Sequence, residues 1–332
     1  MSSPRVVVVT GATSGVGRAV AMEFARRGDA VALIARGRDG LEAAKEDVER
    51  AGGRALVLPA DVSVADQLEA AARATEEALG PIDIWVNNAM TTVFGEFLEI
   101  SPDEFRRASD VTYLGAVWGT RAALRRMIER DRGTIVFVGS AMAYQSIPLQ
   151  SPYCAAKQGE KGFFESLRCE LRHRGSRVHL TMVQLPGLNT PQFEHCETKM
   201  PKHPMPVPPI YQPEVAARAV VWAAEHRRRE VYVGLPSVYT ILGNKLAPWL
   251  AERYLARTAY DSQQMDDQAV NGRPSNLFAP VDGDPGAHGR FEEMAHPRSA
   301  QLLLTENRRW LGLGAALVGI GAAGAALARL LN

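Results

Sequence analysis

Residues 6–17, VVVVTGATSGVG, run four valines into a turn with three glycines, and a helical stretch, RAVAMEFARR, follows. A β-branched run of this kind is typical of a strand buried in a parallel sheet. Gly11, Gly15 and Gly17 let the backbone approach a phosphate closely, and the next helix offers unpaired N–H groups to the anion. A plain strand-to-helix connection is the alternative. The buried strand before the turn and the amphipathic helix after it favour a dinucleotide site.

Outside this turn, short β-branched runs alternate with longer helical stretches. This order predicts an α/β fold, a doubly wound parallel sheet of about seven strands with helices on both faces. In SPDEF, Ser101 is expected to cap a helix and Glu104 to complete a capping box. We predict strands near 5–10, 30–35, 54–59, 82–87, 133–138, 177–184 and 229–233, and helices near 15–27, 39–51, 64–79, 102–130, 152–174 and 213–225.

The end of the second predicted strand indicates which dinucleotide binds. An acidic residue at this place would bind the ribose diol of NAD, but the sequence has Ala35 and Arg36 there. An arginine can pair with the 2′-phosphate of NADP, so NADP(H) is favoured. Arg38 is a candidate for a second contact to this phosphate, although the default interpretation of such an arginine is a solvated side chain.

A second motif, SPYCAAK at residues 151–157, places Tyr153 and Lys157 four residues apart. On a helix the two side chains project from the same face. An ammonium group near a phenol favours the phenolate, which suggests an acid/base tyrosine. For an isolated pair, surface decoration is the default interpretation, so its meaning depends on context.

Composition excludes several classes of function. The 332 residues carry a formal net charge of +1, which gives no global attraction to nucleic acid. Cys154, Cys169 and Cys196 have no C-x-x-C spacing, so we expect reduced thiols and a cytoplasmic catalytic domain. The histidines form no cluster either, so we expect no metal site. Residues 1–5 lead directly into the first strand and leave no room for a secretory signal.

Together, the glycine turn, the strand order and the Tyr-x-x-x-Lys pair resemble the short-chain dehydrogenase/reductase family, in its T-G-x-x-x-G-x-G branch. The resemblance covers about residues 4–235 and implies a Rossmann fold. VNNAM at 86–90 resembles the family's N-N-A-G, and Ser140 stands thirteen residues before Tyr153, as in many members. The implied cofactor contacts are Gly11, Thr13, Ser14, Gly15, Val16, Gly17, Arg36, Asp61, Val62, Asn87, Ala89, Tyr153, Lys157, Pro186, Gly187 and Thr190.

The resemblance implies hydride transfer between nicotinamide and a carbonyl or alcohol carbon. Tyr153 would exchange a proton with the reacting oxygen, Lys157 would depress the pKa of the tyrosine and hold the nicotinamide ribose, and Ser140 would position the reacting oxygen. Relatives commonly pair their long fourth and fifth helices between subunits, which implies a homodimer or homotetramer.

Three positions depart from the family pattern. Met90 replaces a usual glycine, Thr112 replaces the asparagine of the proton relay, and Thr190 lies one residue closer to Pro186-Gly187 than usual. A hydroxyl at position 112 can still hold a water molecule, with fewer donors than an amide. These departures leave open an alternative: a catalytically weak, NADP-binding, membrane-associated sensor or scaffold. A sugar-nucleotide epimerase has a different glycine spacing and a larger substrate domain.

We predict a catalytic domain at residues 1–236, followed by further segments in the carboxyl-terminal part of the chain. The proline-rich residues 199–213 are read as a rim beside the pocket, with a ligand for another protein's aromatic groove as the alternative. Residues 237–307 form an extension of helix and extended loop, with 261–300 wrapping the domain. The apolar stripe within 241–255 is expected to pack in the core, and a membrane surface is the second choice. Within residues 308–332, the apolar stretch 310–328 is predicted to form a helix long enough to anchor the protein in a membrane. An amphipathic helix or a helix docked on a partner protein is the alternative. A membrane anchor would favour a lipophilic substrate.

Overall fold

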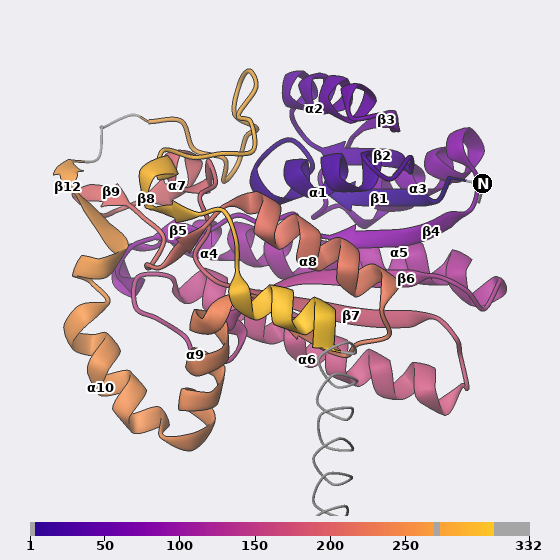
Figure 1. Ribbon diagram of the computed structural model, residues 1–332. Helices are drawn as coiled ribbons and strands as arrows, with labels where there is room; N and C mark the ends of the chain where they lie inside the picture. Colours follow the sequence, from indigo (N-terminus) through magenta and orange to yellow (C-terminus); the bar gives the residue numbers. More distant parts are fainter. Residues whose placement is uncertain (1–3, 269–272, 309–332) are drawn as a thin grey trace, which may run out of the picture.

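The computed structural model describes residues 4–268 and 273–308. Its central sheet has seven parallel strands in the order β11-β7-β6-β4-β1-β2-β3, which confirms the predicted doubly wound sheet (Figure 1). The strand order reverses between β1 and β4, and ligands of such sheets bind at the carboxyl ends of the strands there. The strands are β1 (Val6–Thr10), β2 (Ala30–Ala35), β3 (Arg54–Pro59), β4 (Ile82–Asn87), β6 (Thr134–Ser140), β7 (His179–Leu185) and β11 (Glu230–Tyr232).

Helices cover both faces of this sheet because side chains alternate along a strand. Val7 and Val9 of β1 belong to one apolar core, and Val6 and Val8 belong to the other. The first core includes side chains of α1 (Gly15–Ala25), α2 (Arg38–Arg50) and α8 (Pro213–Glu225); the second includes side chains of α3 (Ala65–Leu79), α5 (Gly115–Glu129) and α6 (Ser151–His173).

One predicted helix, at 102–130, is interrupted. It consists of α4 (Pro102–Ser109), a π-helical turn at Asp110–Leu114, and α5. Such turns insert an extra residue into a helix and often lie at functional sites. The predicted capping box of Ser101 and Glu104 is confirmed at the start of α4.

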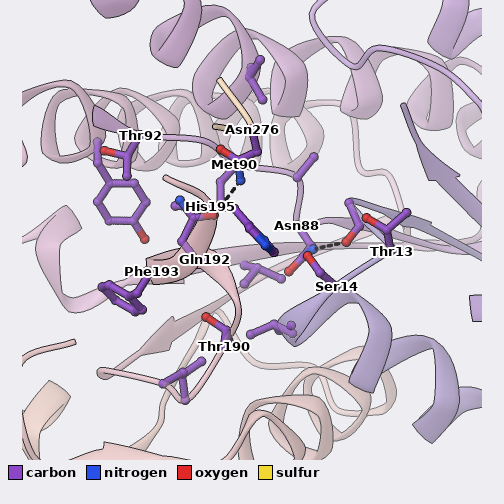
Figure 2. A pocket seen from close by; sticks show the side chains of 18 of the residues that line it. Thr13, Ser14, Asn88, Met90, Thr92, Thr190, Gln192, Phe193, His195 and Asn276 are labelled. Atoms are coloured by element: carbon purple, nitrogen blue, oxygen red, sulfur yellow. Dashed lines mark hydrogen bonds between the residues drawn. The ribbon is translucent and has the colours of Figure 1, made fainter. Parts of the chain in front are cut away.

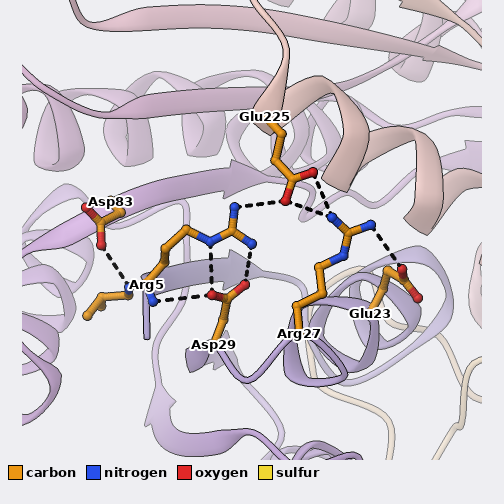
Figure 3. A network of polar contacts seen from close by, with 7 residues as sticks. Arg5, Glu23, Arg27, Asp29, Asp83 and Glu225 are labelled. Atoms are coloured by element: carbon orange, nitrogen blue, oxygen red, sulfur yellow. Dashed lines mark hydrogen bonds and ion pairs between the residues drawn. The ribbon is translucent and has the colours of Figure 1, made fainter. Parts of the chain in front are cut away.

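A network of charged side chains holds the amino-terminal edge of the sheet together (Figure 3). Arg5 pairs with Asp29 at 2.6 Å and with Glu225 at 2.9 Å, and Arg27 also pairs with Glu225. Arg5 directly precedes β1, whereas Glu225 is the last residue of α8. The network therefore ties the first strand to a helix more than two hundred residues later in the chain.

A helical hairpin, α9 (Gly234–Leu246) and α10 (Pro248–Thr258), follows the last strand of the sheet and projects from the body of the molecule (Figure 1). The expectation that its apolar stripe packs in the core is wrong. Leu242, Leu246, Trp249, Leu250 and Tyr254 are all exposed, and Leu246 at the tip is 85% exposed. The stripe lies on the outer surface because the hairpin stands beside the sheet rather than over it, and its contact with a membrane surface remains a prediction.

Beyond the hairpin, the chain returns to the main body of the molecule through two-stranded sheets. β12 (Gln264–Gln268) pairs with β9 (Lys202–Pro204), and β13 (Ala295–His296) pairs with β10 (Ile210–Tyr211). β12 and β13 thus lie beside strands of the segment 202–211, and the wrapping of the domain by residues 261–300 stays a prediction. The remaining elements are β5 (Val93–Phe94), α7 (Gln192–His195), β8 (Glu197–Thr198) and 3₁₀ turns at Phe97–Glu99, Ala141–Ala143, Asp261–Gln263 and Glu292–Met294.

A last helical stretch, residues 300–308, packs on the first core through the buried Leu302. The predicted apolar helix at 310–328 lies outside the described residues. Within the part of the chain that the structure describes, no helix has the length and apolar character needed to cross a bilayer.

Candidate functional site

A cavity of about 290 Å³ lies at the carboxyl ends of the central strands, where the strand order reverses. It reaches from the turn after β1 to the end of β6 and the start of α6. Most of the residues predicted for the site line this cavity: Gly11, Thr13, Ser14, Gly15, Val16, Arg36, Asp61, Val62, Ala89, Ser140, Tyr153, Lys157, Pro186, Gly187 and Thr190.

The glycine turn is shaped by a close approach of the backbone to itself. Gly11 has a φ of 67°, a conformation that favours glycine. A Cβ atom on Gly17 would lie 2.1 Å from the carbonyl oxygen of Gly11 and 2.5 Å from the side-chain nitrogen of Asn88. Gly17 does not line the cavity, so its role is to hold the turn against α1. The resulting cradle of backbone at a helix start fits a pyrophosphate group.

The two asparagines that follow β4 have different places. The amide of Asn87 is buried, accepts a hydrogen bond from Trp85 and donates one to Thr120, both at 2.9 Å. Asn88 lines the cavity and donates to the carbonyl oxygen of Thr10 at 2.9 Å. The cavity is therefore lined by Asn88 and not by the predicted Asn87, whose contacts instead join β4 to α5.

Thr112 lies in the π-helical turn and is buried. Its hydroxyl donates to the backbone oxygen of Thr91 at 2.8 Å and accepts from the backbone nitrogen of Thr91 at 3.0 Å. The hydroxyl has one donor, and that donor is used. Thr112 does not line the cavity, so it fixes the loop after β4, and its contacts do not supply the water-holding role considered for it.

Ser140, Tyr153 and Lys157 meet at one end of the cavity because β6 ends beside the first turn of α6. The Nζ atom of Lys157 lies 5.9 Å from the centre of the Tyr153 ring. It donates to the backbone oxygen of Val138 at 2.6 Å and to the Oε2 atom of Glu160 at 2.8 Å. Glu160 was missed in the sequence, although a carboxylate one turn after Lys157 on a helix that packs into the core was the available signal.

The Lys157–Glu160 pair sets the charge around the tyrosine. Burial raises the pKa of Tyr153, and the charge of Lys157 and a hydrogen bond with Ser140 offset only part of this rise, while Glu160 adds to it. The pKa of Tyr153 therefore lies above its ordinary value, and the expected lowering by Lys157 is outweighed. Burial also raises the pKa of Glu160, whose second oxygen has no hydrogen-bond partner among the described residues.

Arg36 stands at the other end of the cavity, next to Asp61. Its guanidinium donates to the backbone oxygens of Asn276 and Leu277, and the Asp61 carboxylate pairs with Arg107 at 2.6 Å. Burial and the nearby Arg107 lower the pKa of Arg36. The arginine is thus held at the cavity wall with a positive charge that no carboxylate among the described residues neutralises by a direct ion pair.

Residues 276–286 form a roof over this end of the cavity, and we call this segment the roof. Pro280, Val281 and Pro285 line the cavity from above the glycine turn. The backbone nitrogen of Gly15 donates to the oxygen of Gly286 at 3.0 Å, and Asp284 pairs with Arg18 of α1 at 2.8 Å. The sequence predicted a wrapping loop in this region but gave no sign that it lies over the glycine turn.

The end of the cavity beside Ser140, Tyr153 and Lys157 has a mainly apolar lining. Figure 2 shows Thr92, Gln192, Phe193 and His195 gathered at one end, away from Thr13 and Ser14. Residues from 91–98, 141–150 and 188–212 contribute to the walls, and Pro206 and Val207 of the proline-rich segment line the cavity as well. Burial lowers the pKa of His195, so this ring is neutral near pH 7. Further lining side chains are Met90, Phe94, Met142 and Leu188.

The amino-acid sequence is similar to those of a known protein family and of several known proteins. A model of the short chain dehydrogenase family matches residues 5–200. An uncharacterized oxidoreductase of Bacillus subtilis (strain 168), YxnA, is 31% identical over 97% of this chain and 90% of its own length. The 3-dehydrosphinganine reductase of Danio rerio is 34% identical over 65% of this chain and 67% of its own length.

Two solved structures are similar to this chain over much of its length. A short-chain dehydrogenase from Streptomyces avermitilis has a TM-score of 0.63 and 26% identity, covering 79% of this chain and 100% of that one. An alcohol dehydrogenase from Thermococcus sibiricus, complexed with 5-hydroxy-NADP, has a TM-score of 0.60 and 25% identity, covering 70% and 96% of the two chains. The sheet and the cavity therefore belong to a fold that carries oxidoreductases.

Proposed function

The chain belongs to the short-chain dehydrogenase/reductase family, and we propose that it is an NADP(H)-dependent oxidoreductase of lipophilic carbonyl or alcohol substrates. The observation that carries the proposal is the placement of Ser140, Tyr153 and Lys157 in one cavity with the glycine turn. The bound dinucleotide supplies or accepts the hydride. The glycine turn holds its pyrophosphate, and the apolar end of the cavity excludes water from the reacting carbon.

The catalytic residues have separate tasks in this proposal. Tyr153 donates a proton to the carbonyl oxygen during reduction and accepts it during oxidation. Ser140 hydrogen-bonds the same oxygen and sets its distance from the nicotinamide ring. Lys157, held by Val138 and Glu160, keeps a positive charge near the phenol. A raised tyrosine pKa keeps the phenol protonated near pH 7, which suits the reductive direction.

The apolar wall around Phe94, Phe193 and Leu188 supports a lipophilic substrate, as does the name of the Danio rerio relative. The test is a panel of ketones with increasing alkyl chain length, each assayed by oxidation of NADPH and of NADH. The proposal expects turnover that rises with chain length until the cavity is filled. Tight binding of NADPH with no turnover on the whole panel would instead favour the alternative, a membrane-associated sensor or scaffold.

Cofactor choice is expected to depend on Arg36. Replacing Arg36 with alanine removes a charge-assisted contact to the 2′-phosphate and should raise the KM for NADPH by roughly tenfold to a hundredfold. The KM for NADH should change little, and Arg38→Ala, an exposed neighbour outside the cavity lining, is the matched control. An equal rise for both dinucleotides would mean that Arg36 acts only by anchoring the roof.

Glu160 is expected to tune the proton transfer. In Glu160→Gln the charge of Lys157 is no longer balanced, so the phenolate of Tyr153 becomes easier to form and the pKa of Tyr153 falls. The acidic limb of the kcat/KM profile for alcohol oxidation should then move to lower pH. The groups whose charges act on Tyr153 are Lys157, Glu160 and Cys154, all on α6, with the Ser140 hydroxyl facing it from β6.

The matched control for this measurement is Glu165→Gln. Glu165 lies on the same helix but pairs with Lys161 and Arg229 at the surface. Its replacement should leave the pH profile in place. A profile that does not move in Glu160→Gln, or that moves equally in both variants, would assign Glu160 a purely structural part.

A further inference from the structure

A second cavity, of about 260 Å³, lies where α6 ends and β7 begins. None of the residues that line it within the described ranges is acidic. Its polar lining is formed by a serine, a histidine and five arginines, and we call it the arginine cavity: Arg168, Arg172, Arg177, Arg227, Arg229, Ser176 and His179.

The arginine cavity is separate from the catalytic cavity. His179 is the first residue of β7 and pairs with Thr134, whereas Ser140 ends β6 and pairs with Leu185. Six residues of strand separate the two ends, or roughly 20 Å at about 3.3 Å per residue. The two cavities therefore open at opposite edges of the sheet, and no residue lines both.

The fold brings these arginines together from three segments. Arg168 and Arg172 lie one turn apart on α6, and Arg177 is in the loop that follows the helix. Arg227 and Arg229 precede β11, which pairs with β7 in parallel. Because β6, β7 and β11 are neighbours, the loops at their amino ends meet at the same edge.

Much of this positive charge is not neutralised. Arg177 pairs with Asp131 at 3.0 Å, and Arg229 pairs with Glu165 and Glu230. Among residues 4–268 and 273–308, Arg168, Arg172 and Arg227 have no carboxylate within ion-pair distance. The guanidinium of Arg168 donates only to the backbone oxygen of Leu180 in this part of the chain.

The arginines are not gathered here to bind the free carbonyl oxygens at the end of α6. Its last carbonyl oxygens already accept backbone hydrogen bonds from Arg174, Gly175 and Ser176. The repulsion is also visible at His179, where burial together with Arg168 and Arg227 lowers the pKa to about 4. The arginine cavity thus has a positive electrostatic potential and a neutral histidine. A bound anion would reduce the repulsion between its positive charges.

We propose that the arginine cavity binds a phosphate-bearing anion with at least two negative charges. Guanidinium groups bind phosphate oxygens through two parallel hydrogen bonds, and several arginines around one cavity match the charge of a pyrophosphate or a phosphomonoester. A free phosphorylated metabolite and the headgroup of an anionic lipid share this chemistry. The lining Arg172, Arg177 and Arg227 are exposed, so both kinds of ligand can reach the cavity.

The test measures binding of inorganic pyrophosphate to the full chain by calorimetry, and the variants below distinguish the arginine cavity from the glycine turn. The double variant Arg172→Gln/Arg227→Gln should bind roughly a hundredfold more weakly, about tenfold for each charge-assisted contact. Arg174→Gln, an exposed arginine at the same helix end but outside the cavity lining, should leave the affinity unchanged. The pKa of His179, followed by NMR, should rise when pyrophosphate binds.

A second measurement identifies the source of the phosphate. Co-sedimentation with phosphatidylcholine vesicles that contain phosphatidic acid is compared with pure phosphatidylcholine vesicles. Retention on the acidic vesicles alone that is lost in the double variant identifies a lipid headgroup, and loss of pyrophosphate binding without any vesicle effect identifies a soluble ligand. The proposal is overturned if the double variant binds both probes as the wild type does, if Arg174→Gln weakens binding equally, or if neither probe binds.

Discussion

Replacing Tyr153 with phenylalanine is expected to lower kcat for carbonyl reduction by a factor of roughly 10² to 10⁴, the usual contribution of a positioned general acid. The ring stays in place, so the side chain still packs beside Ser140 and Lys157 at the end of the cavity. Cofactor affinity, measured by quenching of protein fluorescence on addition of NADPH, should change by less than about threefold, since the phenol is proposed to act on the substrate oxygen.

The matched control is Tyr144→Phe. Tyr144 lies in the loop between β6 and α6, and its hydroxyl donates to Glu230 instead of lining the cavity. This variant should keep most of its turnover. If Tyr153→Phe reduces ketones as fast as the wild type, the proton must come from another group and the proposed mechanism is wrong.

Replacing Gly17 with alanine is expected to prevent the glycine turn from forming in its observed shape. The new methyl group would lie 2.1 Å from a backbone oxygen, and backbone atoms in a packed core cannot move aside cheaply. We expect a loss of about 3 kcal/mol in the free energy of unfolding, at the upper end of the effect of overpacking. Binding of the dinucleotide should become undetectable at concentrations that saturate the wild type.

The control is Gly162→Ala in α6, where an added Cβ would meet no atom within 4 Å. Alanine in the interior of a helix is favoured over glycine by up to about 1 kcal/mol, so this variant should be equally or more stable. Thermal unfolding and dinucleotide titration of both variants check the prediction. A Gly17→Ala protein that binds the dinucleotide normally would show that the turn can shift, contrary to the packing described here.

The strands and most helices were predictable because their signals are local. The valines of β1 and the capping box at Ser101 specify their structure within a few residues, and both predictions are confirmed. The π-helical turn was not predicted, and the hydroxyl of its Thr112 donates to the backbone oxygen of Thr91, a contact made only once the segment after β4 meets the helix.

The site shows the same division between local and distant information. Gly11, Ser140 and Tyr153 could be placed from motifs, and they do line the cavity. That Asn88 and not Asn87 lines the cavity could not be read from the sequence, because β4 ends at Asn87 and the family motif does not show where the strand ends. Likewise, the apolar stripe of α9 and α10 has the same periodicity on a protein surface as in a core, so the pattern alone gave the wrong environment for Leu246 and Trp249.

The roof has a consequence for the order in which the protein becomes functional during synthesis. Arg18 meets Asp284 across 266 residues, and Arg36 meets Asn276 across 240. The ribosome releases the first strand and its turn long before it makes the segment that covers them. A nascent chain can therefore complete most of its sheet while the end of the cavity beside Arg36 is still open, and this end is covered only after residues 276–286 have been made.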